Sequence, residues 1–260
     1  MKIRLVSLTL TALVLATGAF AQTPAATPLP GNPAERGVPG TNTGPAAAGN
    51  GATTSAVPED AAALNQQSID NLKNKDANAA VELAERATKA DPTKAEYFAQ
   101  LGIALSQRMG EVPFMQMAVM SGKLKKAFEK AVALDPNSIA GLIGLARFYN
   151  NAPEIAGGSL EKAAESGTRL EKVNPFLGAI ELGRIAEKGE KYDEALTHFA
   201  AASTLKPDNP GLQYACGFQL AKLGRKDEAR ARFEAALKID PNHERSQKAL
   251  AELDAPGAAK

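Results

Sequence analysis

From residue 60 to residue 254, apolar residues recur every three or four positions, a spacing that predicts amphipathic helices. Nowhere in this stretch do β-branched residues alternate with polar ones, so no strand is predicted. The helical stretches end at Xaa-Pro pairs, because proline cannot continue a helix and moves the preceding residue out of helical geometry. These pairs are Asp91-Pro92, Asp135-Pro136, Asn174-Pro175, Lys206-Pro207 and Asp240-Pro241. The pattern therefore predicts an all-α chain.

The prolines also indicate an internal repeat. The interval from Pro207 to Pro241 is about 34 residues, and the intervals from Pro92 to Pro136 and from Pro136 to Pro175 are longer, as if two copies carried insertions of about ten and five. Ala229, Phe233 and Ala236 precede Pro241 at the same offsets at which Ala195, Phe199 and Ala202 precede Pro207. The preceding helices share a slot with a larger residue followed by a small one: Leu101-Gly102, Leu145-Ala146, Leu182-Gly183 and Cys216-Gly217.

This pattern resembles the tetratricopeptide repeat, over roughly Asp60 to Asp254. The resemblance implies a right-handed superhelical solenoid of about five helical hairpins, followed by a capping helix over residues 243–253. It also implies that the first helix of each hairpin lines a concave surface that binds proteins or peptides. Two departures are that no Trp occurs early in the motif and that Gly167 stands where the third repeat should have Phe.

The expected concave surface contains a row of candidate binding residues. Two arginines in line with an aromatic residue suit an extended peptide with an acidic side chain or a free C-terminal carboxylate, because guanidinium binds carboxylate through two hydrogen bonds. Alternatively, Arg147 and Arg184 pair internally with Glu187, or are simply solvated. The candidates on this surface are Ile103, Ile143, Arg147, Asn150, Ile180, Arg184, Tyr214 and Phe218.

The longer insertion, residues 110–121, is rich in methionine. It contains Met115, Met117 and Met120. One interpretation is a lid that packs on the solenoid, because methionine fills irregular gaps. A second is an adaptable apolar contact for a partner. A third is a Cu(I) site, since thioethers bind that ion.

The composition argues against catalysis. The two histidines, His198 and His243, lie on different predicted helices without metal-ligand spacing, and no glycine-rich phosphate loop follows a strand. We therefore predict a protein that is not an enzyme and needs no cofactor. With 30 basic and 29 acidic residues, the chain lacks the positive charge expected for nucleic-acid binding. Cys216 is the only cysteine and falls on an inward position, which predicts a buried thiol.

Residues 1–58 differ from the rest of the chain. Residues 1–21 have a basic start, an apolar run and an Ala-Phe-Ala end, which predicts a signal peptide cleaved between Ala21 and Gln22 and a periplasmic or secreted protein. Residues 22–58 are rich in Pro, Ala and Gly and predict a disordered linker. Residues 59–254 form the predicted repeat domain, and residues 255–260 a disordered tail. No integral membrane segment is predicted after cleavage.

Taken together, the patterns predict a scaffold or adaptor of the cell envelope that holds a protein or peptide on its concave face. Two alternatives remain open. One is a small-ligand or copper-binding accessory protein of an envelope system, with the three methionines as its site. The other is a structural protein that assembles into a homo-oligomer.

Overall fold

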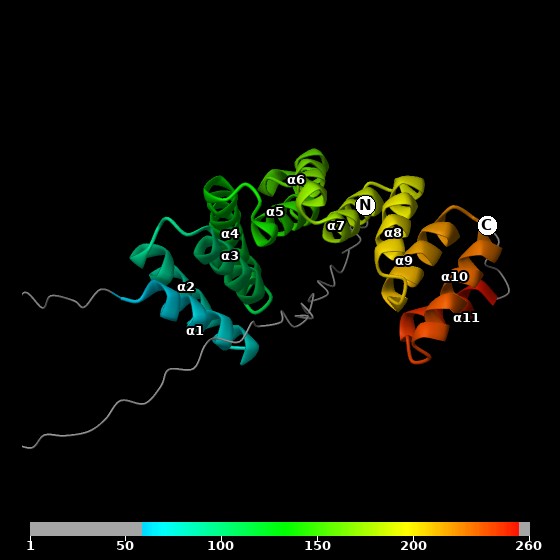
Figure 1. The fold of residues 1–260 in the computed structure, drawn as a ribbon, viewed down its shortest axis with the longest axis horizontal. Helices are drawn as coiled ribbons and strands as arrows, with labels where there is room; N and C mark the ends of the chain where they lie inside the picture. The colour runs from blue at the N-terminus through cyan, green and yellow to red at the C-terminus, as the bar shows by residue number, and fades with distance from the viewer. Residues whose placement is uncertain (1–58, 255–260) are drawn as a thin grey trace, which may run out of the picture. The chain divides into compact units, whose positions relative to one another are not determined.

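The computed structural model describes residues 59–254, which form eleven α-helices and one short 3-10 helix, with no strand in that range (Figure 1). The predicted signal peptide, linker and tail lie outside the described residues. The all-α solenoid is confirmed, and its helices are α1 (Ala61–Lys73), α2 (Ala77–Ala90), α3 (Ala95–Met109), α4 (Phe114–Leu134), α5 (Ile139–Asn151), η1 (Glu154–Ala156), α6 (Leu160–Val173), α7 (Pro175–Lys188), α8 (Tyr192–Leu205), α9 (Pro210–Lys222), α10 (Lys226–Ile239) and α11 (Glu244–Asp254).

Consecutive helices pair into five hairpins, α1–α2 through α9–α10, with α11 packed on the last one (Figure 1). The first helices of neighbouring hairpins also contact one another: α1 touches α3, α3 touches α5, α5 touches α7, and α9 touches α11. A hydrogen bond between Gln219 and Glu187 links α9 to α7. The first helices therefore lie side by side and share one face of the repeat domain.

The residues before the prolines end the second helices, as predicted. Asp91, Asp135 and Asp240 each leave helical geometry with φ between −134° and −138°. Asn174 ends α6 and also starts α7, because its side chain accepts a hydrogen bond from the backbone N–H of Leu177. Side-chain caps of this kind satisfy one of the free N–H groups at a helix start.

Close packing within the hairpins explains the recurring spacing of Gly and Phe along the chain. A Cβ built on Gly217 would lie 2.6 Å from the ring of Phe233, and one on Gly183 would lie 2.8 Å from the ring of Phe199. The glycine thus lets the second helix approach until the ring fills the space. In the third hairpin Gly167 takes the place of the ring, and its Cβ position lies 2.8 Å from Leu182 of the next hairpin. Leu182 therefore occupies the room that the missing Phe leaves.

The longer insertion begins with a turn at residues 110–113, and its residues 114–121 extend α4 at its N-terminus, so they are helix and not a separate lid. Met120 packs against the apolar core of the first three hairpins, and Met117 is half-buried. Met115 is 79% exposed, and Val119, one turn further along, is exposed beside it. The shorter insertion forms η1 and carries the fully exposed Ile155. Both insertions lie at the turn between the two helices of a hairpin.

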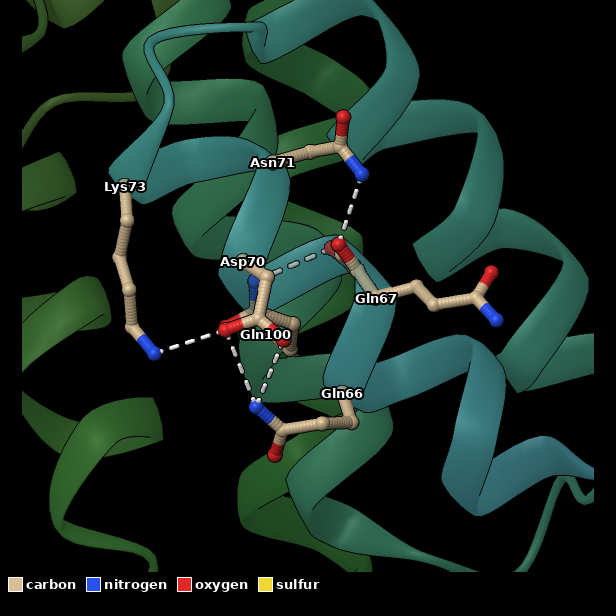
Figure 2. Close-up of polar contacts among 7 residues, drawn as sticks. Gln66, Gln67, Asp70, Asn71, Lys73 and Gln100 are labelled. Atoms are coloured by element: carbon tan, nitrogen blue, oxygen red, sulfur yellow. Dashed lines mark hydrogen bonds and ion pairs between the residues drawn. The ribbon is translucent and has the colours of Figure 1, made fainter.

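The N-terminal helix has a polar side where later first helices are apolar. Asp70 and Asn71 stand where α3, one repeat later, has the buried Ala104 and Leu105. Figure 2 shows how this side is satisfied: Asp70 accepts hydrogen bonds from Lys73 at 2.8 Å and Gln66 at 3.2 Å, and Asn71 donates to the backbone carbonyl of Gln67. Such a polar side suits the first repeat of residues 59–254, because no other repeat in that range packs against it.

Candidate functional site

The predicted binding residues lie on the face formed by the first helices, here called the inner face. Each first helix contributes two residues to this face, one three positions before its recurring small residue and one directly after it. These two positions are four apart, so they lie on the same side of the helix. All are partly exposed except Ala99, which is buried. The inner face consists of Asn65, Ile69, Ala99, Ile103, Ile143, Arg147, Ile180, Arg184, Tyr214 and Phe218.

Two arginines of different hairpins meet at one carboxylate in the middle of this face. Arg147 on α5 donates from Nε at 2.9 Å and from Nη2 at 2.6 Å to Oε1 of Glu181 on α7. Arg184, one turn after Glu181, donates from Nη1 to the same oxygen at 3.0 Å. The internal pairing considered from the sequence therefore exists, but its acid is Glu181, whereas Glu187 was expected.

The burial of these three side chains differs sharply. The Glu181 side chain is 4% exposed, against 25% for Arg147 and 42% for Arg184. A carboxylate this buried requires close partners, because an unpaired charge away from water is very costly. The arginines thus cover Glu181, and their outer surfaces remain open to solvent.

Sequence reasoning missed Glu181. Glu181 lies two positions before the recurring small residue of its helix. The equivalent residue is Gly144 in the third hairpin and Ala215 in the fifth. A charged residue inside the apolar run Phe176–Leu182 was the available signal. Because ion pairs on solvated helix faces are common, that signal alone did not point to a buried carboxylate.

The C-terminal part of the inner face combines aromatic rings with a second acid. The rings of Tyr214 and Phe218 stack with centroids 6.2 Å apart, and Lys222 Nζ lies 5.3 Å from the Phe218 ring centre. Gln219, fully buried, donates to Glu187 Oε2 at 2.9 Å. Burial raises the pKa of Glu187 above its ordinary value, against the opposing effects of the Gln219 hydrogen bond and the Arg184 charge.

The remaining candidates have mainly packing roles. Ile143 contacts the core of the first three hairpins, and Ile180 contacts the core of the fourth. Asn150 is half-buried, and its Oδ1 has no hydrogen-bond partner among the described residues. Of the eight predicted binding residues, the structure therefore joins Arg147 with Arg184 through Glu181, and Tyr214 with Phe218.

Ile103 lies apart from the arginines, in a hollow of about 780 Å³ at the N-terminal end of the inner face. Ile69, Ala99 and Ile139 supply further apolar lining, while Asn65 adds a buried side-chain oxygen without a partner among the described residues. The inner face thus carries apolar residues among polar ones at α1 and α3, arginines at α5 and α7, and aromatic rings at α9.

The methionines of the insertion do not converge on one point. Because a helix turns about 100° per residue, Met115 and Met117 project about 160° apart, on nearly opposite sides of α4. Met120 packs against the core, and Met117, three residues earlier, is half-buried. Within residues 59–254, no group of His, Cys, Asp or Glu has the arrangement of a metal site. Cys216 is buried and unpaired, as predicted.

None of the helices in the described part of the chain is both long and apolar enough to cross a membrane.

Comparison with known proteins agrees with this architecture. Residues 186–253 match a family model described as tetratricopeptide repeat. No curated protein matches the chain. Among solved structures, TTC0263, a thermophilic TPR protein of Thermus thermophilus, is 21% identical with a TM-score of 0.56, over 74% of this chain and 98% of that chain.

Two further structures are similar. YrrB, a TPR protein with an unusual peptide-binding site, is 18% identical with a TM-score of 0.52, over 74% of this chain and 92% of that chain. MamA of Desulfovibrio magneticus RS-1 is 15% identical with a TM-score of 0.57, over 72% of this chain and 99% of that chain. At these identities the similarity establishes the fold.

Proposed function

Because residues 186–253 match the tetratricopeptide repeat family and residues 59–254 have its fold, we propose that the protein is a non-catalytic scaffold. Its ligand is an extended segment of a partner protein, bound on the inner face. The family generally mediates protein–protein contacts, and YrrB is described as having a peptide-binding site. The leader-like residues 1–21 support placing this scaffold in the cell envelope.

One observation carries the proposal: the open arginine pair at the centre of the inner face. Arg147 and Arg184 are held by Glu181 but keep N–H groups for a ligand, since within residues 59–254 neither Arg147 Nη1 nor Arg184 Nη2 donates to another group. On the next first helix, α9, the stack of Tyr214 and Phe218 offers an apolar surface on the same face. A partner segment with an acidic residue and a nearby apolar residue matches both features.

The alternatives have less support. The polar side of α1 disfavours head-to-tail stacking of solenoids, because it presents charge where an apolar contact is needed. The spread of the methionines around α4 disfavours one copper ion held by all three. Met115 and Val119 remain a candidate secondary contact for a partner, as two exposed apolar side chains one turn apart.

The proposal is tested by cross-linking in the native envelope, affinity purification and mass spectrometry. The inner-face variant carries Arg147→Gln, Glu181→Gln and Arg184→Gln, so that no buried charge is left unpaired. A matched control, Lys238→Gln, removes the same net charge from an exposed site on α10. A second variant, Phe218→Ala, tests the aromatic surface. Circular dichroism establishes that each variant folds.

A partner captured by the wild type and the control, and lost from both inner-face variants, supports binding at this surface. A partner retained by every variant refutes the inner-face assignment and directs attention to Met115 and Val119. Failure of the wild type to capture any partner refutes the scaffold function itself.

A further inference from the structure

The arginine pair has an unusual charge balance for an anion site. Two guanidinium groups and one buried carboxylate leave a net charge of one positive unit, and Glu187 and Lys222, which lie within electrostatic reach of this group, add one charge of each sign. Glu181 also uses a single oxygen to accept all three hydrogen bonds from Arg147 and Arg184. Because the acid is buried, water screens it poorly from anything bound against the arginines.

The donors that remain limit what can bind. A guanidinium carries five N–H groups, and Glu181 takes two from Arg147 and one from Arg184. The two side chains that carry the free N–H groups are 25% accessible for Arg147 and 42% accessible for Arg184. A ligand thus meets both arginines with Glu181 directly behind them.

A bound anion therefore interacts with Glu181 as well as with the arginines. A carboxylate, with one negative charge, completes the neutralisation of the site. A phosphate monoester carries about 1.5 to 2 negative charges near neutral pH, so it leaves excess negative charge against a buried acid. Arginine clusters without such an acid are common phosphate receptors.

Building on the scaffold function above, we propose that Glu181 is a specificity-determining residue that restricts the arginine pair to a carboxylate of the partner and excludes a phosphorylated side chain. Glu181 also positions the two guanidinium groups, because it joins α5 to α7. The partner segment is accordingly acidic through Asp, Glu or a chain end. Phosphorylation of that segment does not substitute for the acid.

Two acetylated tetrapeptide amides test the proposal, Ala-Asp-Ala-Phe and the same peptide with phosphoserine in place of aspartate. Each is titrated at pH 7.5 and low salt into the full chain labelled with ¹³C in its isoleucine methyl groups. Ile143 and Ile180 lie one turn before Arg147 and Arg184 on the same helix face and report the arginine pair. Ile69 reports the distant hollow as an internal reference.

For the wild type we expect the aspartate peptide to shift Ile143 and Ile180, and the phosphoserine peptide to bind no more tightly. In Glu181→Gln the preference for phosphoserine over aspartate should rise on the order of tenfold, as expected for removing one buried charge about 5 Å from the ligand. The control Glu234→Gln, on the exposed side of α10, should leave the ratio of affinities unchanged.

A second variant separates charge from shape and guards against a Glu181→Gln protein that does not fold. Arg147→Gln with Glu181→Gln restores one net positive charge without Glu181, and we expect it to lose the phosphoserine preference. A wild type that prefers phosphoserine overturns the proposal, as does a Glu181→Gln ratio within twofold of wild type. If the Glu181→Gln ratio stays within twofold of wild type, only the role of Glu181 is refuted, because the aspartate peptide still binds and the scaffold function stands. No shift at Ile143 or Ile180 with either peptide overturns both.

Discussion

The ring of Phe128 on α4 is bounded by glycines from two different first helices. A Cβ on Gly102 of α3 would lie 2.5 Å from ring atom Cε1, and one on Gly144 of α5 would lie 2.5 Å from Cδ1. The ring is buried, and with a glycine from each flanking helix against it, it has little room to move away from either. We therefore expect Gly102→Ala to destabilise the repeat domain.

The size of this effect is a balance of two terms. Replacing glycine by alanine inside a helix is favourable by about 1 kcal/mol, because the backbone loses less entropy on folding. Forcing a methyl group into a filled core costs about 1–3 kcal/mol or more. Since the contact is much closer than ordinary van der Waals packing, the upper part of that range applies. The net loss should be about 2 kcal/mol, which lowers the melting midpoint by about 4–8 °C for a domain of this size.

Thermal and urea unfolding, followed by the helical circular dichroism signal, measure this loss. Gly122→Ala is the matched control, because it lies on the exposed side of α4 with nothing within 4 Å of the added Cβ. It should stabilise the protein by about 1 kcal/mol. Combining Gly102→Ala with Phe128→Leu should recover part of the loss by shortening the ring side chain. Equal stability of Gly102→Ala and wild type would refute the packing argument.

Three other perturbations give distinct signatures. Burial raises the pKa of Glu187, so the charged carboxylate destabilises the fold as pH rises through that pKa. Glu187→Gln should therefore stabilise the protein by about 1 kcal/mol at pH 7, partly because the new amide can donate to the unpaired oxygen of Gln219. In urea unfolding this gain should shrink toward pH 4, where the wild-type carboxyl is protonated. Burial also raises the pKa of the Cys216 thiol, so a chromogenic thiol reagent at pH 7.5 should react with it only after urea unfolds the chain; rapid native labelling contradicts its placement. Arg147→Gln should lower the free energy of unfolding in urea by about 2 kcal/mol, because it removes two hydrogen bonds from a buried carboxylate. Adding Glu181→Gln should recover part of this loss. A double variant that is less stable than Arg147→Gln alone contradicts this account.

The hairpins and their boundaries were predictable from the sequence because their signals are local. Proline cannot continue a helix beyond its first turn, so Pro136 and Pro241 mark the ends of the preceding helices without knowledge of the rest of the fold. The offset between Gly217 and Phe233 likewise follows from the geometry of one hairpin. The inner-face row was predictable for the same reason, since one helix places residues four apart on one side.

The insertion shows where local signals were insufficient. Its residues carry no helix stop after Pro113, and the structure continues α4 through them as helix. Whether Met115 or Met120 faces the core depends on the rotation of α4 against α3 and α5, which no short stretch of sequence specifies. The same rotation separates the methionines that looked like one cluster along the chain.

The sequence by itself determined the repeat, the all-α class and the face on which Arg147 and Arg184 lie. Only the tertiary structure decided that both arginines meet Glu181, and that the oxygen they share is buried. Arg147 and Glu181 belong to different hairpins, so their contact depends on how α5 packs against α7. Helix periodicity places a residue on a side of its own helix, but the packing of neighbouring helices decides which charges meet and how much water reaches them.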